Sequence, residues 1–228
     1  MSNQSTSGTV ETQPTSDGVA RQLGRQVEDA TRKYKGGTER AQLAMGHPNF
    51  SEEWYSFLSR LAEEQALRLP LIQRPTWKVL TRTCDDANSY TADLKAGGFR
   101  IGDWAADIMK KAGFKKGFDI TTLELVIASG TELTSKERPT TAEIYEGIHN
   151  VNGELIPAWA GPELRKQYPD QPVGEVLIMA METITASDGR PGVFSVGHAD
   201  RVRWLYTRWA RPGYRWDGDG RWVFLRRK

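Results

Sequence analysis

The sequence predicts an α+β protein with a helical extension at its N-terminal end. Three observations support this prediction: a polar first segment, helical periodicity in the first half of the chain, and strand-like apolar segments in the second half. Helices followed by strands, without a regular alternation of the two, are typical of the α+β class. We therefore expect a mainly antiparallel sheet of about five strands and three or four helices.

The chain is expected to have three parts. Residues 1–18 contain one hydrophobic residue besides the initiator Met, so they are expected to form a disordered tail. Residues 19–70 have apolar positions at three- and four-residue steps, which predicts a helical extension. Residues 76–228 are expected to form the α+β domain.

The helices of the domain are predicted from apolar spacing and from residues that cap helix ends. A helix with Tyr90 and Leu94 on its apolar side should end at two glycines. The other predicted helices begin at Asp103, at the T-x-x-E capping box of Thr140 and Glu143, and at Pro162.

The strands are predicted from short runs of apolar, β-branched and aromatic residues. The run 176–181 is apolar on both faces, so we expect it to be a central strand that is covered on both sides. The other predicted strands cover 77–80, 123–129, 192–196, 203–210 and 221–227.

Composition excludes several classes of protein. A single cysteine, Cys84, excludes an internal disulfide framework and an all-cysteine zinc site. No apolar run approaches the roughly 18 residues needed to span a membrane, and the polar start lacks the pattern of a secretory signal. We therefore expect a cytoplasmic protein without a membrane partner.

Motifs for metals, cofactors and nucleophiles are weak or missing. The pair Glu146 and His149 has the spacing of a di-iron ligand pair, but such a site needs a second pair, which the sequence lacks. Phosphate-binding glycine motifs are also missing. Asp85 and Asp86 beside Cys84 should raise the thiol pKa, which argues against a reactive thiolate. No metal and no cofactor are expected.

The C-terminal segment differs from the rest of the chain in charge. Nine basic and two acidic residues give 201–228 a charge of +7, so the other 200 residues carry −5 of the total of +2. The same segment holds four of the eight tryptophans. Along 221–227, Val223 and Leu225 are expected to face inward, whereas Trp222 and Phe224 are expected to face outward or to be half-covered.

Arginine interleaved with aromatic rings is the chemistry with which proteins stack bases and neutralise phosphates. The same residues also occur in ordinary strands, where rings pair across a sheet and arginine stems cover them. The leading functional hypothesis is a non-catalytic module that binds an anionic partner such as RNA or single-stranded DNA. The candidate binding residues are Arg203, Trp204, Arg208, Trp209, Arg211, Arg215, Trp222 and Arg226.

Two alternative functions stay open. One is an interaction protein whose N-terminal helices, within 19–70, dock a protein partner. The other is a small hydrolase-like enzyme with acid–base groups near the predicted central strand. Its candidate residues are Glu163, Arg165, Asp170, Glu175, Glu182, Asp188 and His198.

Four segments of the domain carry a resemblance to other sequences. They read FRIGDWAADIM (99–109), AGPELRKQYPDQPVGEVLIMAME (160–182), ITASDGRPGVFSV (184–196) and RWVFLRRK (221–228). With them, 76–228 resembles a widespread family of uncharacterised bacterial proteins common in candidate-phylum genomes. The resemblance implies a recurring domain and no particular activity. The family usually has a cysteine shortly before its G-P-x-L-R motif, whereas this chain has Ile156, Pro157 and Ala158 there.

Overall fold

A computed structural model describes residues 53–54, 56–57, 60–61 and 71–227. The chain divides into two compact units, 1–61 and 62–228. The six described residues of the first unit are helical. The predicted tail and most of the predicted helical extension lie outside the described residues.

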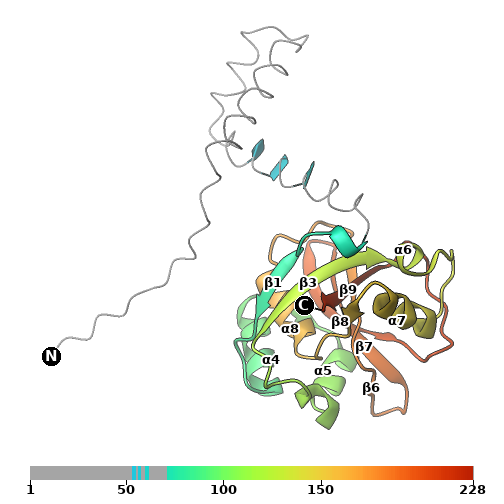
Figure 1. Cartoon of the computed structure of the whole chain (residues 1–228). Coiled ribbons are helices and arrows are strands. Elements are labelled where there is room, and N and C mark those ends of the chain that lie inside the picture. Colours follow the sequence, from blue (N-terminus) through green and yellow to red (C-terminus); the bar gives the residue numbers. More distant parts are fainter. Residues whose placement is uncertain (1–52, 55, 58–59, 62–70, 228) are drawn as a thin grey trace, which may run out of the picture. The chain divides into compact units, whose positions relative to one another are not determined.

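The described part of the second unit contains a nine-stranded mixed sheet that forms a half-barrel (Figure 1). The strand order is β1-β3-β9-β5-β7-β8-β2, with β4 beside β9 and β6 beside β7. The pairs β5–β9 and β2–β8 are parallel, and the others are antiparallel. The strands are β1 (Lys78–Thr81), β2 (Arg100–Ile101), β3 (Thr122–Ser129), β4 (Gly153–Glu154), β5 (Val176–Met179), β6 (Ile184–Thr185), β7 (Pro191–Ala199), β8 (Val202–Trp209) and β9 (Arg221–Arg226).

Five α-helices and two short 3-10 helices occur in residues 71–227. None of the helices in the described part of the chain is long and apolar enough to cross a bilayer. The helices are η1 (Leu71–Gln73), α4 (Ala87–Ala96), α5 (Asp103–Met109), η2 (Ala112–Lys115), α6 (Gly130–Thr134), α7 (Thr141–Asn150) and α8 (Ala160–Gln167).

The expected mainly antiparallel sheet of about five strands with three or four helices is therefore wrong. The strands β2, β4 and β6 have two residues each, which is too short to produce a visible alternation. The parallel pairing of β5 with β9 joins segments more than 40 residues apart in the sequence, and no local sequence pattern predicts this pairing. The additional helix α6 has only five residues.

Several individual elements agree with the sequence prediction. The strand β3 and the capping box of Thr140 and Glu143 are present as expected. The second predicted helix begins at Asp103, but Gly102 is its cap, and it ends at Met109 instead of continuing to a glycine. The helix around Pro162 begins two residues earlier than expected.

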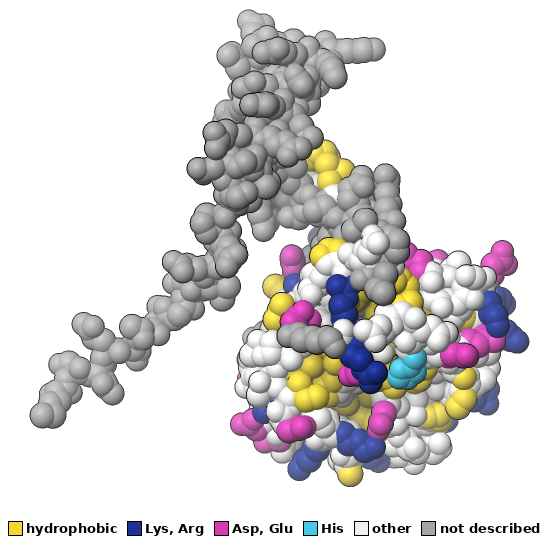
Figure 2. Space-filling model, in the orientation of Figure 1, with side chains coloured by type: hydrophobic (Ala, Val, Ile, Leu, Met, Phe, Trp, Pro, Cys, Tyr) yellow, Lys and Arg dark blue, Asp and Glu magenta, His cyan; other side chains and the backbone are white. Residues whose placement is uncertain are grey.

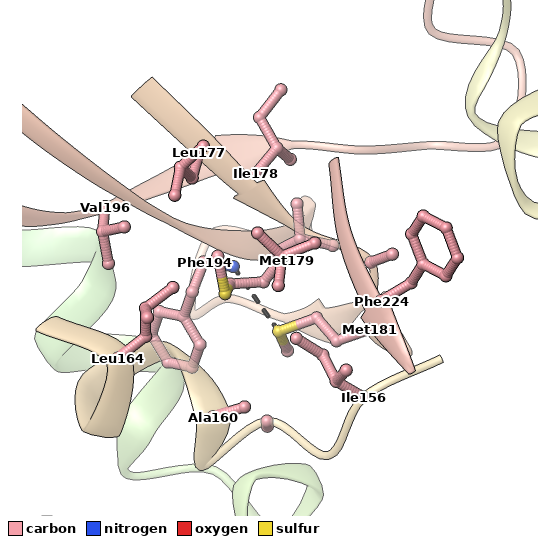
Figure 3. Packing of buried hydrophobic residues seen from close by; sticks show 14 of the residues in the cluster. Ile156, Ala160, Leu164, Leu177, Ile178, Met179, Met181, Phe194, Val196 and Phe224 are labelled. Atoms are coloured by element: carbon pink, nitrogen blue, oxygen red, sulfur yellow. Dashed lines mark hydrogen bonds between the residues drawn. The ribbon is translucent and has the colours of Figure 1, made fainter. Parts of the chain in front are cut away.

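One face of the sheet carries the main core. Leu177, Val196 and Leu205 occupy one row across β5, β7 and β8, and all three are fully buried. The helices α4, α5 and α8 cover this face. Figure 3 shows Leu164 and Ala160 of α8 beside Phe194 of β7, whose backbone N–H donates to Met181 Sδ.

The opposite face is covered only in part. Trp222 of β9 is fully buried there, because Tyr145 of α7 and Trp216 of the preceding loop pack edge-on against its ring. Phe224 is buried on the same face. The expectation that these two β9 side chains face outward or are half-covered is thus corrected: both faces of β9 are covered.

Candidate functional site

A hollow lies on this partly covered face, between β5, β8 and the loop that precedes β9. Its volume is about 540 Å³, which is within the usual range for a small-molecule site. Arginine and aromatic residues predominate in its lining. The lining residues are Arg138, Val176, Ile178, Thr207, Arg208, Trp209, Tyr214, Arg215, Trp216, Asp217, Asp219 and Gly220.

Three arginines, Arg138, Arg208 and Arg215, come to this hollow from separate parts of the chain. All three are exposed, and none forms an ion pair with a carboxylate within residues 71–227. The Arg215 guanidinium donates from Nη1 to the Arg138 carbonyl oxygen at 3.0 Å, which links the two segments. Three guanidinium groups without carboxylate partners provide hydrogen-bond donors and charge for an anion.

Trp216 lines the hollow and is 7% exposed. Its indole Nε1 donates to the Thr141 hydroxyl at 2.8 Å, which fixes the ring between α7 and β9. The Nε1 of Trp222 has no hydrogen-bond partner among the described residues. This nitrogen is buried behind Gly220, where a Cβ atom would lie 4.0 Å from it, so it does not reach the hollow.

A rigid acidic turn forms part of the rim. The Gly218 N–H donates to the Glu137 carbonyl, and the Gly218 carbonyl accepts from Thr131 N, both at 2.7 Å. Asp217 and Asp219 are exposed and form no ion pair within residues 71–227. The rim therefore offers carboxylate acceptors beside the arginine donors.

Three of the predicted binding residues, Arg208, Trp209 and Arg215, line the hollow. The Trp209 ring is already occupied, because Arg190 lies 3.9 Å from its centroid and Trp104 packs edge-on against it. Trp209 therefore contributes less free ring surface than its sequence position indicated.

The other predicted binding residues are dispersed. Trp222 is fully buried and contributes no exposed ring. Arg226 donates to the carbonyl oxygens of Leu71 and Arg74, so its guanidinium is engaged within the fold. Arg203 pairs in register with His198, on the face opposite to the hollow. Arg211 is exposed but is not among the residues that line the hollow, and Trp204 lies farther along β8.

Sequence reasoning missed several lining residues. Tyr214 and Trp216 belong to the same basic and aromatic segment, so the composition of 201–228 could have included them. Arg138 and Ile178 come from other elements, and only the folded topology brings them to this place. No local signal in the sequence distinguishes Arg138.

The residues of the enzyme hypothesis do not form one cluster. Arg165 is fully buried, donates to Gln171 and to two backbone carbonyls, and has no carboxylate on its guanidinium within the described residues. His198 Nδ1 lies 2.5 Å from the Gln171 carbonyl. Glu175 adjoins them, because its carbonyl accepts from His198 N and from Gln171 Nε2, and its carboxylate pairs with Arg221. Elsewhere, Glu182 pairs with Lys116 and Asp188 with Arg190, while Asp170 is exposed.

Glu163 belongs to a separate, buried hydrogen-bond network. Its carboxylate accepts from Thr83 N and Tyr90 Oη, both at 2.8 Å, and from Gln167 Nε2 at 2.7 Å. Burial, together with the Glu163 carboxylate, raises the pKa of Tyr90. Nearby, Lys166 Nζ lies 3.9 Å from Glu163 Oε1. This network holds β1 and α4 against α8.

Cys84 lies at the edge of the same network. Its Sγ is 3.3 Å from both Lys166 Nζ and Asp93 Oδ2. Burial raises the pKa of the Cys84 thiol, and the hydrogen bond from Lys166 lowers the pKa of Asp93. The direction of the Cys84 pKa shift agrees with the sequence prediction, but the main cause of the shift is burial and not the neighbouring aspartates.

Charge on the surface is locally mixed. Figure 2 shows basic and acidic side chains interspersed on the face in view. Within the described residues, no three His, Cys, Asp or Glu side chains are grouped closely enough to hold a metal ion.

The chain was compared with protein-family models, with curated proteins and with solved structures, and none of them matches it. The resemblance to a bacterial family therefore stays a prediction from the four sequence segments.

Proposed function

We propose that this chain is a non-catalytic binding module whose arginine hollow binds the phosphates of a single-stranded nucleic acid. The observation that carries the proposal is the convergence of Arg138, Arg208 and Arg215, without carboxylate partners, on one hollow. Guanidinium groups bind phosphate oxygens in a bidentate manner, and phosphate contacts supply most of the affinity of such complexes.

The other lining groups favour a nucleotide over a purely acidic ligand. Asp217 and Asp219 on the rim accept hydrogen bonds, which ribose hydroxyls and base amino groups can donate. A polyglutamate-like ligand has only acceptors on its side chains, so these two carboxylates would repel it.

Fluorescence polarisation with a labelled single-stranded RNA octamer tests this proposal. We expect Arg208→Ala to weaken binding about tenfold, as for a lost hydrogen bond to a charged group. Lys116→Ala is the matched control, because it removes the same charge from an exposed pair with Glu182, which lies outside the hollow. Equal loss in both variants, or no binding by the wild-type protein at low salt, would overturn the proposal.

A further inference from the structure

We infer that the exposed face of β8 continues the arginine hollow and binds unstacked bases, so the partner is an extended single strand of several nucleotides. This inference rests on the proposed function of the hollow and goes beyond it, because the hollow alone would also suit a free nucleotide. The surface is formed by Arg100, Trp204, Tyr206 and Arg208, which we call the β8 ladder.

Three members of the β8 ladder lie on the same side of the strand β8. Trp204, Tyr206 and Arg208 are alternate residues of β8, so their side chains project to the same face at intervals of about 6.6 Å. Arg208 is exposed, and the two rings are partly exposed. The helix α5 packs against the opposite side of β8, where Trp104 touches Trp209. Trp209 is the last residue of β8, and there it also borders the hollow.

Strand register joins the β8 ladder to the hollow. Tyr206 pairs with Ser195, which pairs with Ile178, and Ile178 lines the hollow. The next row runs from Trp204 through Gly197 to Val176, which also lines the hollow. Paired residues of neighbouring strands lie on the same face, so the two surfaces adjoin.

The order of chemical groups along the ladder suits a single strand. Trp204 and Tyr206 stack with centroids 4.8 Å apart and planes 11° apart, while Arg208 follows at one end. At the other end, the Arg100 guanidinium lies 6.0 Å from the Trp204 centroid and forms no ion pair within residues 71–227.

A ligand can therefore displace Arg100 from Trp204 without breaking an ion pair. Cations at both ends of an aromatic pair match phosphates that flank unstacked bases, the pattern of sequence-tolerant single-strand binding. The Gly197 position between Trp204 and Val176 carries no side chain that would stand between the ladder and the hollow.

A length series of oligouridylates separates this inference from the proposed function. Uridine monophosphate, a tetramer and an octamer are titrated by competition against the labelled octamer. If the β8 ladder binds bases, affinity rises steeply from the monomer to the octamer. Trp204→Ala then weakens octamer binding at least fivefold and leaves monophosphate binding unchanged. Trp204→Phe restores part of the loss. Trp77→Ala, beside β1 at the other end of the strand order and outside the hollow, has no effect.

Each other outcome is decisive. Equal affinity for all lengths, together with unchanged octamer binding by Trp204→Ala, would overturn the claim that the β8 ladder binds bases. The hollow would then remain as a nucleotide site. Absence of binding for every length would overturn the proposed function as well. An acidic peptide or a DNA duplex that competes as strongly as the octamer would show that the partner is not a single strand. Thermal melts of both Trp204 variants establish that they are folded.

Discussion

The indole rings of Trp216 and Trp222 meet edge to face, with centroids 4.8 Å apart and planes 83° apart. This contact fixes the loop before β9 on the sheet, and the same loop carries Tyr214, Arg215 and the acidic turn that line the hollow. The shape of the hollow therefore depends on core packing on the face of the sheet that α7 covers.

Two substitutions at Trp216 separate its ring from its hydrogen bond. Trp216→Phe keeps an aromatic ring against Trp222 but loses the 2.8 Å bond to the Thr141 hydroxyl, so it should cost about 1 kcal/mol of unfolding free energy. Trp216→Ala also loses the packing and should cost about 3–5 kcal/mol. Urea unfolding measures both values, and equal costs for the two variants would show that the ring contact contributes nothing.

The buried carboxylate of Glu163 should be essential for stability. Glu163→Ala leaves the Thr83 N–H and the Tyr90 hydroxyl without their acceptor and removes one of the two acceptors of the Gln167 amide, so we expect a loss of about 3–5 kcal/mol. The control is Glu182→Ala, which removes an exposed carboxylate and should change stability by less than about 1 kcal/mol. Similar unfolding midpoints for the two variants would contradict this account of the network.

The capping box of α7 should make stability depend on pH. The hydrogen bond from Lys136, together with that from the Thr140 N–H, lowers the pKa of Glu143 from 4.5 to about 2. Because the folded-state pKa is the lower one, this contribution is complete above about pH 4.5 and is lost as the pH falls towards 2. Glu143→Gln should therefore be less stable than wild type at pH 7.

That difference should shrink steadily below about pH 4.5. Urea midpoints of the two proteins, taken in one-unit steps from pH 7 to pH 3, measure it. A difference between the two urea midpoints that stays constant over this pH range would mean that the Glu143 carboxylate has no ionic role in the folded state.

Close packing of α6 on α7 depends on Gly147. A Cβ atom at this position would overlap the carbonyl oxygen of Leu133, which is backbone and cannot rotate away. Gly147→Ala should thus cost about 1–3 kcal/mol, as overpacking does elsewhere. Gly213→Ala is the control, since a Cβ atom there has open space and the backbone has no positive φ. Equal melting temperatures for both variants would refute the steric argument.

Local signals predicted the elements that are long or well capped. The T-x-x-E pattern of Thr140 and Glu143 predicted α7, and the apolar run of β3 predicted a strand. Each of these patterns is complete within a few consecutive residues. The predicted helices omit α6, although it has a comparable box, Ser129 with Glu132. Pairing of distant strands has no local pattern, so the mixed sheet was not predictable.

The candidate site, too, was predictable only where its residues belong to a local pattern in the sequence. The basic and aromatic composition of the C-terminal segment pointed to Arg208 and Arg215, which line the hollow. Alternation placed Trp222 on an outward face, but that face is covered by Tyr145 and Trp216, which sequence periodicity does not reveal. Arg138 reaches the hollow only through the folded topology.

The most direct test of the phosphate contacts is the salt dependence of octamer binding by wild type and by an Arg208→Ala, Arg215→Ala double variant. For single strands, the slope of log K against log salt falls by about 0.7 for each phosphate contact that is removed, so two lost contacts should reduce it by about 1.4. Parallel slopes for the two proteins would contradict the account, because they would show that these arginines do not contact phosphates.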